Sequence, residues 1–406
     1  MKPVKAGNIM ITVEKAFERI VMNAKPLTTE RVAVAEASGR VLAAPLAARR
    51  SQPGADLSAM DGYAVRSADL TGDMRELSVV RESAAGAPYE HECKAGQAVR
   101  IFTGAVVPKG ADQVVIQENV EARDGRIFTR EAAEPHKNIR AMGIDFLEKQ
   151  VVLDAGTFLT PKSLGLAASA GHSHLMVHRA PRVAILATGD ELADPAKASF
   201  APHETVNSTA PQLMALFRDA GADCSYIGQA GDSLKALQDT IKKAKGADLL
   251  ITLGGASVGD KDLMQQALAQ EGMRLDFWKV AMRPGKPLIF GQIGDMRVLG
   301  LPGNPVSAFV CALLFARPLI DQLMGRPAPL PQGVPLPLAA DMPANGLRQH
   351  YVRARLIGVP GSRALDPAVD QDSSLLTVLA QSDGLIIRAP EAPAAKAGDF
   401  VPFLPF

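Results

Sequence analysis

The residues best suited to chemistry lie in four glycine-containing turns between residues 188 and 305. The turns read TGDE from 188, GGASVG from 254, PGK from 284 and PGNP from 302. Three of them directly follow an apolar run that predicts a strand, so they lie at the carboxyl end of that strand. An open α/β sheet binds its ligand there, and glycine lets backbone N–H groups approach an anion closely. These turns therefore predict a site for a ligand that carries phosphate or another oxyanion.

Charged side chains of both signs accompany these turns. Carboxylates could hold a divalent metal ion, and cations could neutralise oxyanions. The carboxylates are Asp190, Glu191, Asp232, Asp260 and Asp262, and the cations are Lys279, Arg283 and Lys286.

Taken singly, several of the aspartates have a purely structural interpretation. Asp61 and Asp145 each neighbour a glycine, and aspartate is common in such turns because its side chain bonds to nearby backbone. Asp232 precedes a predicted helix and could cap it. A functional interpretation of these three residues therefore needs support from the wider set of motifs.

One of the turns also fits two better-known motifs. Asp260 separates Gly259 from Lys261, so the Gly-Lys-Ser/Thr element of a nucleotide-hydrolysing P-loop is missing. The same turn fits G-x-S-x-G, with Ser257 as nucleophile and His350 downstream as the base. A serine hydrolase that uses Ser257 therefore stays open as a third function.

Three histidines, His172, His174 and His178, suggest a metal site because the first two would share one face of a strand. No neighbouring cysteine or acid completes a ligand set. We prefer to interpret them as surface histidines near a domain junction.

Composition excludes several classes of protein. The chain has 406 residues, 47% hydrophobic and 21% charged, which predicts a folded protein of two to three domains. A formal net charge of +1 gives no global basic surface for nucleic acid or membranes. Three cysteines without metal-ligand spacing indicate a reducing compartment, and the longest apolar stretch, 306–316, is too short to span a bilayer. We expect a cytoplasmic protein that binds neither nucleic acid nor membranes.

The apolar pattern changes twice along the chain. Residues 13–24 fit one face of an amphipathic helix, and residues 51 to about 154 contain short strand-like runs, with a hairpin turn at Asp124-Gly125. From 182 to about 325, strands alternate with helices, as in an α/β domain.

Capping residues and prolines mark the ends of the later elements. Asp232 or Ser233 can cap the helix that follows them, and Asn304 and Pro305 suit the start of the last helix of the α/β region. The proline-rich segment 327–338 predicts a linker, and residues 336–406 predict a small β module.

Seven motifs in a fixed order resemble the molybdopterin molybdenumtransferase family, which includes MoeA and the E domain of gephyrin. They are SAMDGYAVR (58–66), VRIFTGAVVPKGAD (99–112), NIRAMGID (138–145), ATGDEL (187–192), GGASVGDKD (254–262), FWKVAMRPGKP (277–287) and LPGNPVSA (301–308). A C-terminal QDSSLLTVLAQSDGLI resembles the last module of the family, so the match runs along the whole chain.

The resemblance implies an α/β multi-domain fold. An α/β molybdopterin-binding domain with a doubly wound sheet would occupy residues 181–326, and an inserted β-rich domain residues 51–145. An N-terminal linker or dimerisation domain would combine 1–50 with 146–180, and a C-terminal β-barrel module would occupy 331–406.

The resemblance also implies a reaction and partners. Such an enzyme inserts molybdenum from molybdate into adenylylated molybdopterin and releases AMP, with Mg²⁺ or another divalent cation. It would act as a homodimer with an active site between protomers, and other molybdenum cofactor biosynthesis proteins are further candidate partners. The alternative is a non-catalytic paralogue that binds molybdopterin or serves as a scaffold.

The family pattern assigns roles position by position. Catalytic roles would belong to Asp61, Asp145, Glu191, Asp232, Asp262 and Lys279, and the four aspartates would hold the metal ion. Substrate-binding roles would belong to Thr103, Asp190, Asn207, Gly254, Gly255, Ser257, Gly259, Arg283, Lys286, Pro302, Gly303, Asn304, Pro305 and Ser373. Arg283 stands where the family often has lysine, and its planar fork binds oxyanions bidentately.

Overall fold

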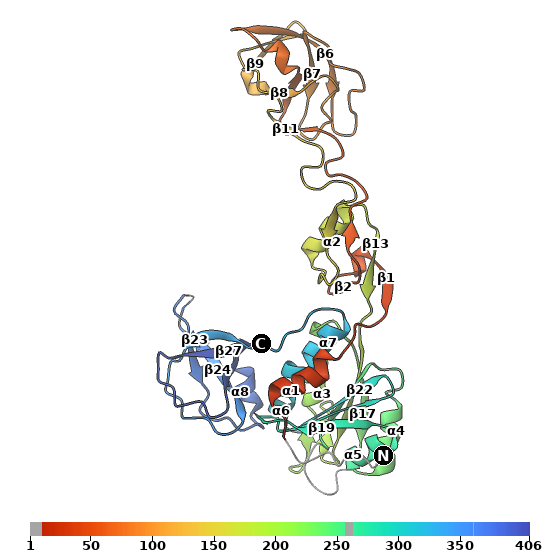
Figure 1. Ribbon diagram of the computed structural model, residues 1–406, viewed down its shortest axis with the longest axis vertical. Helices are drawn as coiled ribbons and strands as arrows, with labels where there is room; N and C mark the ends of the chain where they lie inside the picture. Colours follow the sequence, from red (N-terminus) through yellow and green to blue (C-terminus); the bar gives the residue numbers. More distant parts are fainter. Residues whose placement is uncertain (1–9, 256–262, 360) are drawn as a thin grey trace. The chain divides into compact units, whose positions relative to one another are not determined.

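The structure, a computed structural model, describes residues 10–255, 263–359 and 361–406. The chain divides into two units, whose helices and strands are labelled in Figure 1. The first unit contains residues up to 30, residues 39–41 and residues 178–406. The second unit contains residues 31–38 and 42–177.

A six-stranded mixed sheet forms the core of the first unit, in the order β17-β14-β18-β22-β21-β19. Its four parallel strands are Asp223–Ala230 (β17), Arg182–Thr188 (β14), Leu249–Leu253 (β18) and Met296–Leu301 (β22). Pro287–Ile293 (β21) runs antiparallel to β22, and Arg274–Lys279 (β19) runs antiparallel to β21. The α/β prediction is confirmed, and the sheet is mixed because a two-residue turn at Gly294 reverses the chain between β21 and β22.

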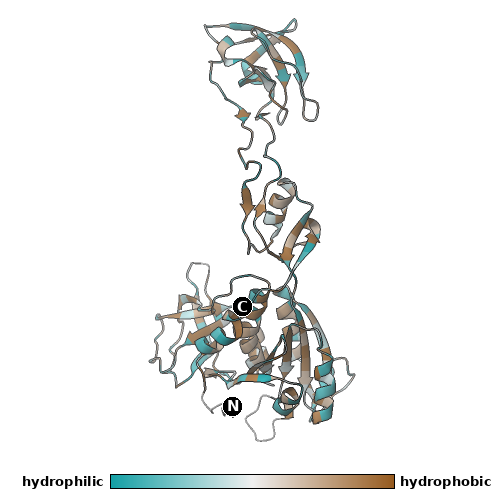
Figure 2. Cartoon of the chain, turned by 45° about the vertical axis from the view of Figure 1, so that its right-hand side comes forward, coloured by the Kyte–Doolittle hydropathy of each residue, from teal (hydrophilic) through white to brown (hydrophobic). Residues whose placement is uncertain are grey.

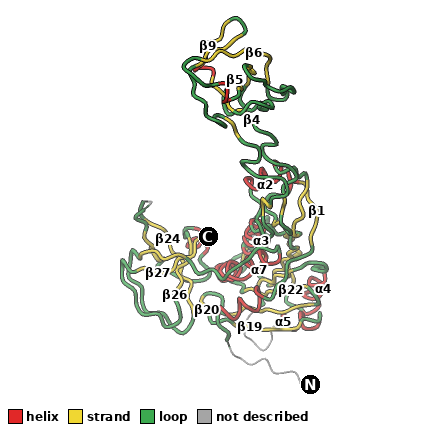
Figure 3. Tube along the Cα trace, turned by 45° about the horizontal axis from the view of Figure 1, so that its top comes forward, coloured by secondary structure: helices red, strands yellow, loops and turns green. Residues whose placement is uncertain are grey.

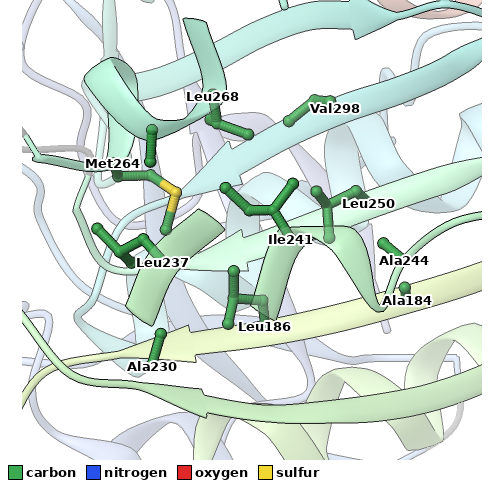
Figure 4. Packing of buried hydrophobic residues seen from close by; sticks show 11 residues of the cluster. Ala184, Leu186, Ala230, Leu237, Ile241, Ala244, Leu250, Met264, Leu268 and Val298 are labelled. Atoms are coloured by element: carbon green, nitrogen blue, oxygen red, sulfur yellow. The ribbon is translucent and has the colours of Figure 1, made fainter. Parts of the chain in front are cut away.

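Two groups of helices cover this sheet. Leu234–Lys242 (α4) and Leu263–Gln270 (α5) pack against each other and bury apolar side chains over β14, β18 and β22 (Figure 4). The second group contains Thr209–Asp219 (α3), Pro305–Cys311 (α6) and Arg317–Leu323 (α7). Strand β18 is buried along its whole length, as expected for a strand covered on both faces. Figure 2 shows that the strands of the central sheet are largely hydrophobic.

The predicted N-terminal helix is also present. It begins at Val13 with Val13–Phe17 (α1) and continues through a π-helical stretch, Glu18–Met22 (η1), which contacts α7. Thr12 caps it by accepting a hydrogen bond from the N–H of Lys15.

The helical run Pro305–Leu323 is longer than the apolar stretch 306–316 expected from the sequence. It joins α6 to α7 through a π-helical stretch, Ala312–Ala316 (η5). Among the described residues, it is the one helix long and apolar enough, by length and composition, to cross a membrane. Its most apolar window is 78% buried inside the protein, so packing in the core accounts for its composition.

The C-terminal part of the first unit is rich in β-structure. Its sheet has the order β20-β24-β26-β27-β23, with β25 paired to β24. The strands are Met282–Arg283 (β20), Val334–Pro337 (β23), Gln349–Ile357 (β24), Ala364–Pro367 (β25), Gly384–Arg388 (β26) and Phe400–Pro405 (β27), accompanied by the helix Leu376–Ala380 (α8). The prediction of a linker over 327–338 is wrong for its second half. Strand β23 contains Pro335 and Pro337, which a strand tolerates here because β23 lies at the edge of the sheet.

A second six-stranded sheet, in the order β8-β5-β7-β6-β10-β9, dominates the second unit. Its strands are Gly62–Val65 (β5), Arg75–Ser83 (β6), Gln97–Ile101 (β7), Gln113–Ile116 (β8), Val120–Arg123 (β9) and Arg126–Thr129 (β10). The predicted hairpin is confirmed: β9 and β10 pair around Asp124 and Gly125, which have φ angles of 51° and 73°. Figure 3 shows this region as strands and loops, as the sequence predicts, with the short 3-10 turns Ser67–Asp69 (η3) and Gln117–Asn119 (η4).

The remaining strands form small sheets. Thr29–Ala33 (β1), His174–His178 (β13) and Val41–Leu42 (β2) form one, in the order β1-β13-β2. Three pairs are Ile139–Arg140 (β11) with Leu57–Ser58 (β4), Val151–Leu153 (β12) with Leu46–Ala47 (β3), and Leu192–Ala193 (β15) with Thr205–Val206 (β16). Two helical segments remain, Val34–Glu36 (η2) and Pro161–Ser169 (α2), and Thr160 with Ser163 forms a capping box at the start of α2.

Candidate functional site

The glycine turns at the carboxyl ends of β14, β18 and β22 lie against one another. A Cβ atom on Gly254 would lie 2.8 Å from the hydroxyl oxygen of Thr188, and a Cβ on Gly303 would lie 3.6 Å from the Cα of Gly254. The N–H of Gly254 donates to the carbonyl of Leu301 at 3.2 Å. Gly254 and Gly255 have φ angles of 85° and 64°, which disfavour residues with side chains. The prediction that three of these turns directly follow strands is confirmed, and the described residues of the turns also lie close together.

Acids surround this meeting point. Glu191 folds back over Gly189, where a Cβ would lie within 2.6 Å of its carboxylate. The carboxylate of Asp190 accepts a hydrogen bond from the backbone N–H of Asp232 at 3.2 Å. The turns after β14 and β17 are thus in contact, and the side chain of Asp232 is exposed.

The ambiguity over the cap of α4 is also resolved. The hydroxyl oxygen of Ser233 accepts a hydrogen bond from the N–H of Ala236 at 3.2 Å, so Ser233 is the N-cap. Asp232 is therefore not needed for capping and remains available to a ligand.

Cations follow β19. The ammonium of Lys279 lies 3.9 Å from the centroid of the Trp278 ring, and the N–H of Val280 donates to the carbonyl of Lys286 at 3.0 Å. That hydrogen bond closes the loop from which Arg283 extends. Arg283 pairs in register with His350 of β24. Burial first, and then the charges of Arg283 and other arginines, lower the pKa of His350 to about 4, so it is poorly matched to act as a general base near pH 7.

The PGNP turn contacts the C-terminal β module. The side-chain amide of Asn304 donates to the hydroxyl of Ser373 at 2.8 Å, and the N–H of Val306 donates to the carbonyl of Ser373 at 3.3 Å. Pro302 is buried, Asn304 stands at the N-cap position and Pro305 begins α6, as predicted. The Asn304 side chain makes no capping hydrogen bond, and its amide nitrogen donates to Ser373.

A cavity of about 380 Å³ lies beside the turn at Gly189. It is lined in part by Asn207, Met214, Tyr226 and Gln229. The amide of Asn207 donates to the Tyr226 hydroxyl at 3.0 Å, and the amide of Gln229 donates to the carbonyl of Gly189 at 2.7 Å. The wall of the cavity is thus fixed to the turn that carries Asp190 and Glu191.

The second unit carries Asp61 directly before β5. The N–H and the hydroxyl of Thr103 both donate to one oxygen of Asp61, Oδ1, at 2.7 and 2.8 Å. These two hydrogen bonds, helped by the charge of Arg100, hold the pKa of Asp61 below its ordinary value. Asp61 is exposed and therefore lies ionised at the surface. Asp61 and Thr103, both named as site residues from the family pattern, are therefore in direct contact.

Asp145 lies on a neighbouring segment of the same unit. Its N–H donates to the carbonyl of Gln52 at 3.0 Å, and Asp56 accepts a hydrogen bond from the N–H of Met142 at 2.7 Å. The exposed apolar residues Met142 and Ile144 flank Asp145. Asp56 was not predicted, although its carboxylate holds the loop that carries Asp145.

The three histidines have different partners. His172 contacts the carbonyl of Ala47, His174 the hydroxyl of Ser173 and His178 the carbonyl of Leu27. Within the described ranges, no group of three or more His, Cys, Asp or Glu side chains could hold a metal ion.

Family models match the chain in three consecutive segments. They are the MoeA N-terminal region (domain I and II) at residues 11–171, a probable molybdopterin binding domain at 184–322 and the MoeA C-terminal region (domain IV) at 335–406. The molybdopterin molybdenumtransferase of Haemophilus influenzae is 38% identical over 322 residues, which are 78% of each chain. The chain belongs to the MoeA family. The enzyme of the same name from Bacillus subtilis is 35% identical and covers 93% of this chain and 90% of its own. A solved structure, titled molybdopterin biosynthesis MoeA protein from Pyrococcus horikosii, matches with a TM-score of 0.86 at 26% identity and covers 98% of this chain and 99% of its own.

Some residues predicted for this MoeA-family site lie outside the described residues. They are Ser257, Gly259, Asp260 and Asp262. Ser257 is the proposed hydrolase nucleophile, and Asp262 is one of the proposed metal ligands. The structure brings together Gly254 with Gly303, Asp190 with Asp232, Asn304 with Ser373, and Asp61 with Thr103.

Sequence reasoning missed Arg353 in this MoeA-family chain. Its side chain is 1% exposed, and its guanidinium donates to the carbonyls of Asp372 and Leu375 at 2.9 and 3.1 Å. The loop that carries Ser373 is therefore built around a buried cation. Burial lowers the pKa of Arg353, since its contacts are with neutral oxygens. The available signal was an arginine within the otherwise apolar run of β24 from 351 to 354.

Proposed function

We propose that this molybdopterin molybdenumtransferase inserts molybdenum from molybdate into the dithiolene of adenylylated molybdopterin and releases AMP. The main structural support is that three glycine turns meet at the carboxyl edge of the sheet, beside Asp190 and Asp232. Such an edge offers backbone N–H groups to a phosphate. Family membership supplies the reaction class.

Cations and hydroxyls near the turns suit the second substrate. Molybdate is a tetrahedral dianion and needs charge-assisted hydrogen bonds. Arg283, Lys279 and Lys286 would supply the positive charge, and Ser373 would supply a hydroxyl. The contact between Ser373 and Asn304 supports this role because it holds the hydroxyl against the PGNP turn.

Mg²⁺ or another divalent cation would be held by Asp61, Asp145, Asp232 and Asp262. The donor chemistry fits, because Asp61, Asp145 and Asp232 are exposed carboxylates and hard divalent cations prefer oxygen ligands. When bound, such a cation would offset the charge of the phosphates. Glu191 folds over Gly189 and would fix the conformation of the turn after β14, beside the cation and the phosphates.

We further propose that the active form is a homodimer. The proposed metal ligands come from different units of the chain, since Asp61 and Asp145 belong to the second unit and Asp232 to the first, and the acids of a second copy would complete the set. Asp61, Asp145 and Thr103 of one copy would then face the α/β domain of the other. The accompanying domain division is 1–50 with 146–180, 51–145, 181–326 and 331–406.

The cavity beside Gly189 would take one of the two ring systems of the substrate. Its volume lies within the range of small-molecule pockets, and Tyr226 and Met214 offer apolar surface for a flat heterocycle. Asn207 and Gln229 would supply the polar contacts. The three cysteines are buried free thiols, which supports a reducing, cytoplasmic location.

The test is AMP release from adenylylated molybdopterin, with Mg²⁺ and with or without molybdate. We expect molybdate-dependent release that Asp61→Asn and Asp262→Asn each reduce by about 100-fold or more. Asp73→Asn is the matched control, since Asp73 is an exposed aspartate of the second unit outside the site. Binding of the pterin without AMP release under any oxyanion or metal condition would contradict the proposal and favour a binding or scaffold paralogue.

A further inference from the structure

Arg100 of β7 lies directly behind the turn that presents Asp61. One guanidinium nitrogen, Nη1, donates to the carbonyl of Gly62 at 3.0 Å, and the other, Nη2, donates to the side-chain oxygen of Gln117 at 2.7 Å. Gln117 in turn donates its backbone N–H to the carbonyl of Asp61 at 3.1 Å. The carbonyls of Asp61 and Gly62 are therefore both tied to one small network.

Two aromatic rings hold the guanidinium in place. Its central carbon lies 5.0 Å from the ring centroid of Tyr63 and 4.9 Å from that of Phe102, within the range of cation–π attraction. Tyr63 follows the Asp61 turn, and Phe102 precedes Thr103. Arg100 thus connects the two segments whose contact fixes the Asp61 carboxylate.

The Gly62 backbone leaves little freedom on the opposite side. A Cβ atom at Gly62 would lie 2.0 Å from the carbonyl oxygen of Val115, so the turn is pressed against β8. Thr103 occupies Oδ1 of Asp61, and among the described residues Oδ2 accepts no hydrogen bond. The network therefore fixes the carboxylate while one oxygen stays available.

We propose that Arg100 is a positioning residue that fixes the Asp61 turn, so that Oδ2 is presented to the ligand in a single orientation. The inference rests on the proposed function, because it takes Asp61 as a site residue. Arginine is required because its planar fork reaches two acceptors while it stacks on two rings. Lysine would keep the positive charge, but its single nitrogen could not bond to both acceptors and stack on both rings.

The test compares Arg100→Gln and Arg100→Lys in the full chain. We expect Arg100→Gln to lower kcat for molybdate-dependent AMP release by about 10- to 100-fold, with little change in KM, since small displacements of a reacting group have effects of this size. Arg100→Lys should recover part of the loss. Arg123→Gln is the matched control, because Arg123 stacks on Phe128 in the same sheet without touching the Asp61 turn. It should stay within about 2-fold of the wild type.

A double mutant separates positioning from general stability. If Arg100 acts through Asp61, Arg100→Gln added to Asp61→Asn should lower the rate by less than about 3-fold further. Full additivity, or a wild-type rate for Arg100→Gln alone, would overturn the inference.

Hydrogen exchange gives a readout that does not depend on activity. The backbone amides of Thr103 and Gln117 donate to Asp61, and they should exchange faster in Arg100→Gln than in the wild type. In Arg123→Gln their exchange rates should equal those of the wild type. Unchanged exchange in Arg100→Gln would overturn the inference even where the wild type is active. Failure of the wild type to release AMP would instead contradict the proposed function, and the exchange result would still decide whether Arg100 fixes the turn.

Discussion

The acidic residues at the two edges of the central sheet differ in whether they form ion pairs. At the amino edge, Asp248 precedes β18 and accepts two hydrogen bonds from the guanidinium of Arg179, both at 2.6 Å. The N–H of Arg182 donates to the same carboxylate at 2.8 Å. At the carboxyl edge, Asp190 and Asp232 form no ion pair with any described residue. Arginines of the chain neutralise the acid at one edge, and the acids at the other edge remain available to a ligand.

This difference in ion pairing indicates that the acid at the amino edge serves stability and the acids at the carboxyl edge serve function. Paired acids contribute to folding, whereas unpaired acids side by side oppose it and are retained where a ligand supplies the opposite charge. Replacing the arginine that pairs with the acid at the amino edge should therefore change stability and leave activity, and replacing the acids at the carboxyl edge should do the reverse.

Gly254→Ala should have the largest effect. The new Cβ would meet the Thr188 hydroxyl at 2.8 Å and force a φ of 85° on alanine. We expect AMP release to fall by more than about 100-fold and the free energy of unfolding to fall by about 1–3 kcal/mol. Gly272→Ala is the control, because it has a similar φ of 88° but an added Cβ meets nothing within 4 Å. Equal activity losses in both variants would show that backbone strain, and not the contact between turns, causes the effect.

The sequence was sufficient to predict the ligand-binding edge of the sheet, but not the distant residues that contact it. Glycines after apolar runs indicate where strands end, and parallel strands bring those ends together, so the sequence predicts a ligand site at the edge that carries Gly254 and Gly303. The contact of Asn304 with Ser373 joins residues 69 positions apart, and no local pattern encodes it. The same holds for Arg353, since a buried arginine satisfied by carbonyls depends on the path of a distant loop.

Two other segments show where local chemistry is ambiguous. Ser233 and Asp232 are both good caps, and only the geometry of α4 selects Ser233. Prolines in 327–338 favoured a linker, but proline is also acceptable at a sheet edge, where β23 lies. Local preferences therefore predicted the elements, and tertiary contacts decided between equal local choices.

Asp232→Asn should reduce activity strongly and leave stability unchanged. Its carboxylate is exposed and its backbone N–H, which bonds to Asp190, remains. We expect molybdate-dependent AMP release about 100-fold below the wild type. Urea unfolding should show an equal or slightly higher free energy, because repulsion from Asp190 is removed. A marked loss of stability would show that Asp232 is structural and would weaken the contrast between the two edges.

Arg179→Gln should have the opposite signature. The Asp248 side chain is 12% exposed, and losing its bidentate partner should cost about 2 kcal/mol of unfolding free energy. Activity at a temperature where the variant stays folded should be unchanged. Arg355→Gln is the control, since it breaks an ion pair with Asp366 in which the two side chains are 56% and 33% exposed, and it should cost less than about 0.5 kcal/mol.

The cost of Arg179→Gln should also depend on pH. Burial by itself raises the pKa of Asp248, but hydrogen bonds from Arg179 and from the N–H of Arg182 outweigh burial and lower that pKa. A carboxyl with a lowered folded-state pKa stabilises the protein above its unfolded pKa of about 4, and the contribution disappears as pH falls through the folded value. The stability difference between wild type and variant should therefore be constant from pH 6 to 8 and shrink below about pH 4. A constant difference down to pH 3 would show that Asp248 is not the group responsible.

Ser233→Ala should have the smallest effect, and it tests whether the neighbours Asp232 and Ser233 have separate roles. Losing the cap of α4 should lower the free energy of unfolding by about 1 kcal/mol, while Ser233→Asp, which can cap, should restore most of it. AMP release should stay within about 2-fold of the wild type, because the Ser233 hydroxyl bonds to Ala236 and not to the turns. A large loss of activity in Ser233→Ala with normal stability would mean that the functional edge extends into the first turn of α4. The division between ligand-binding and structural residues would then lie one residue further along the chain.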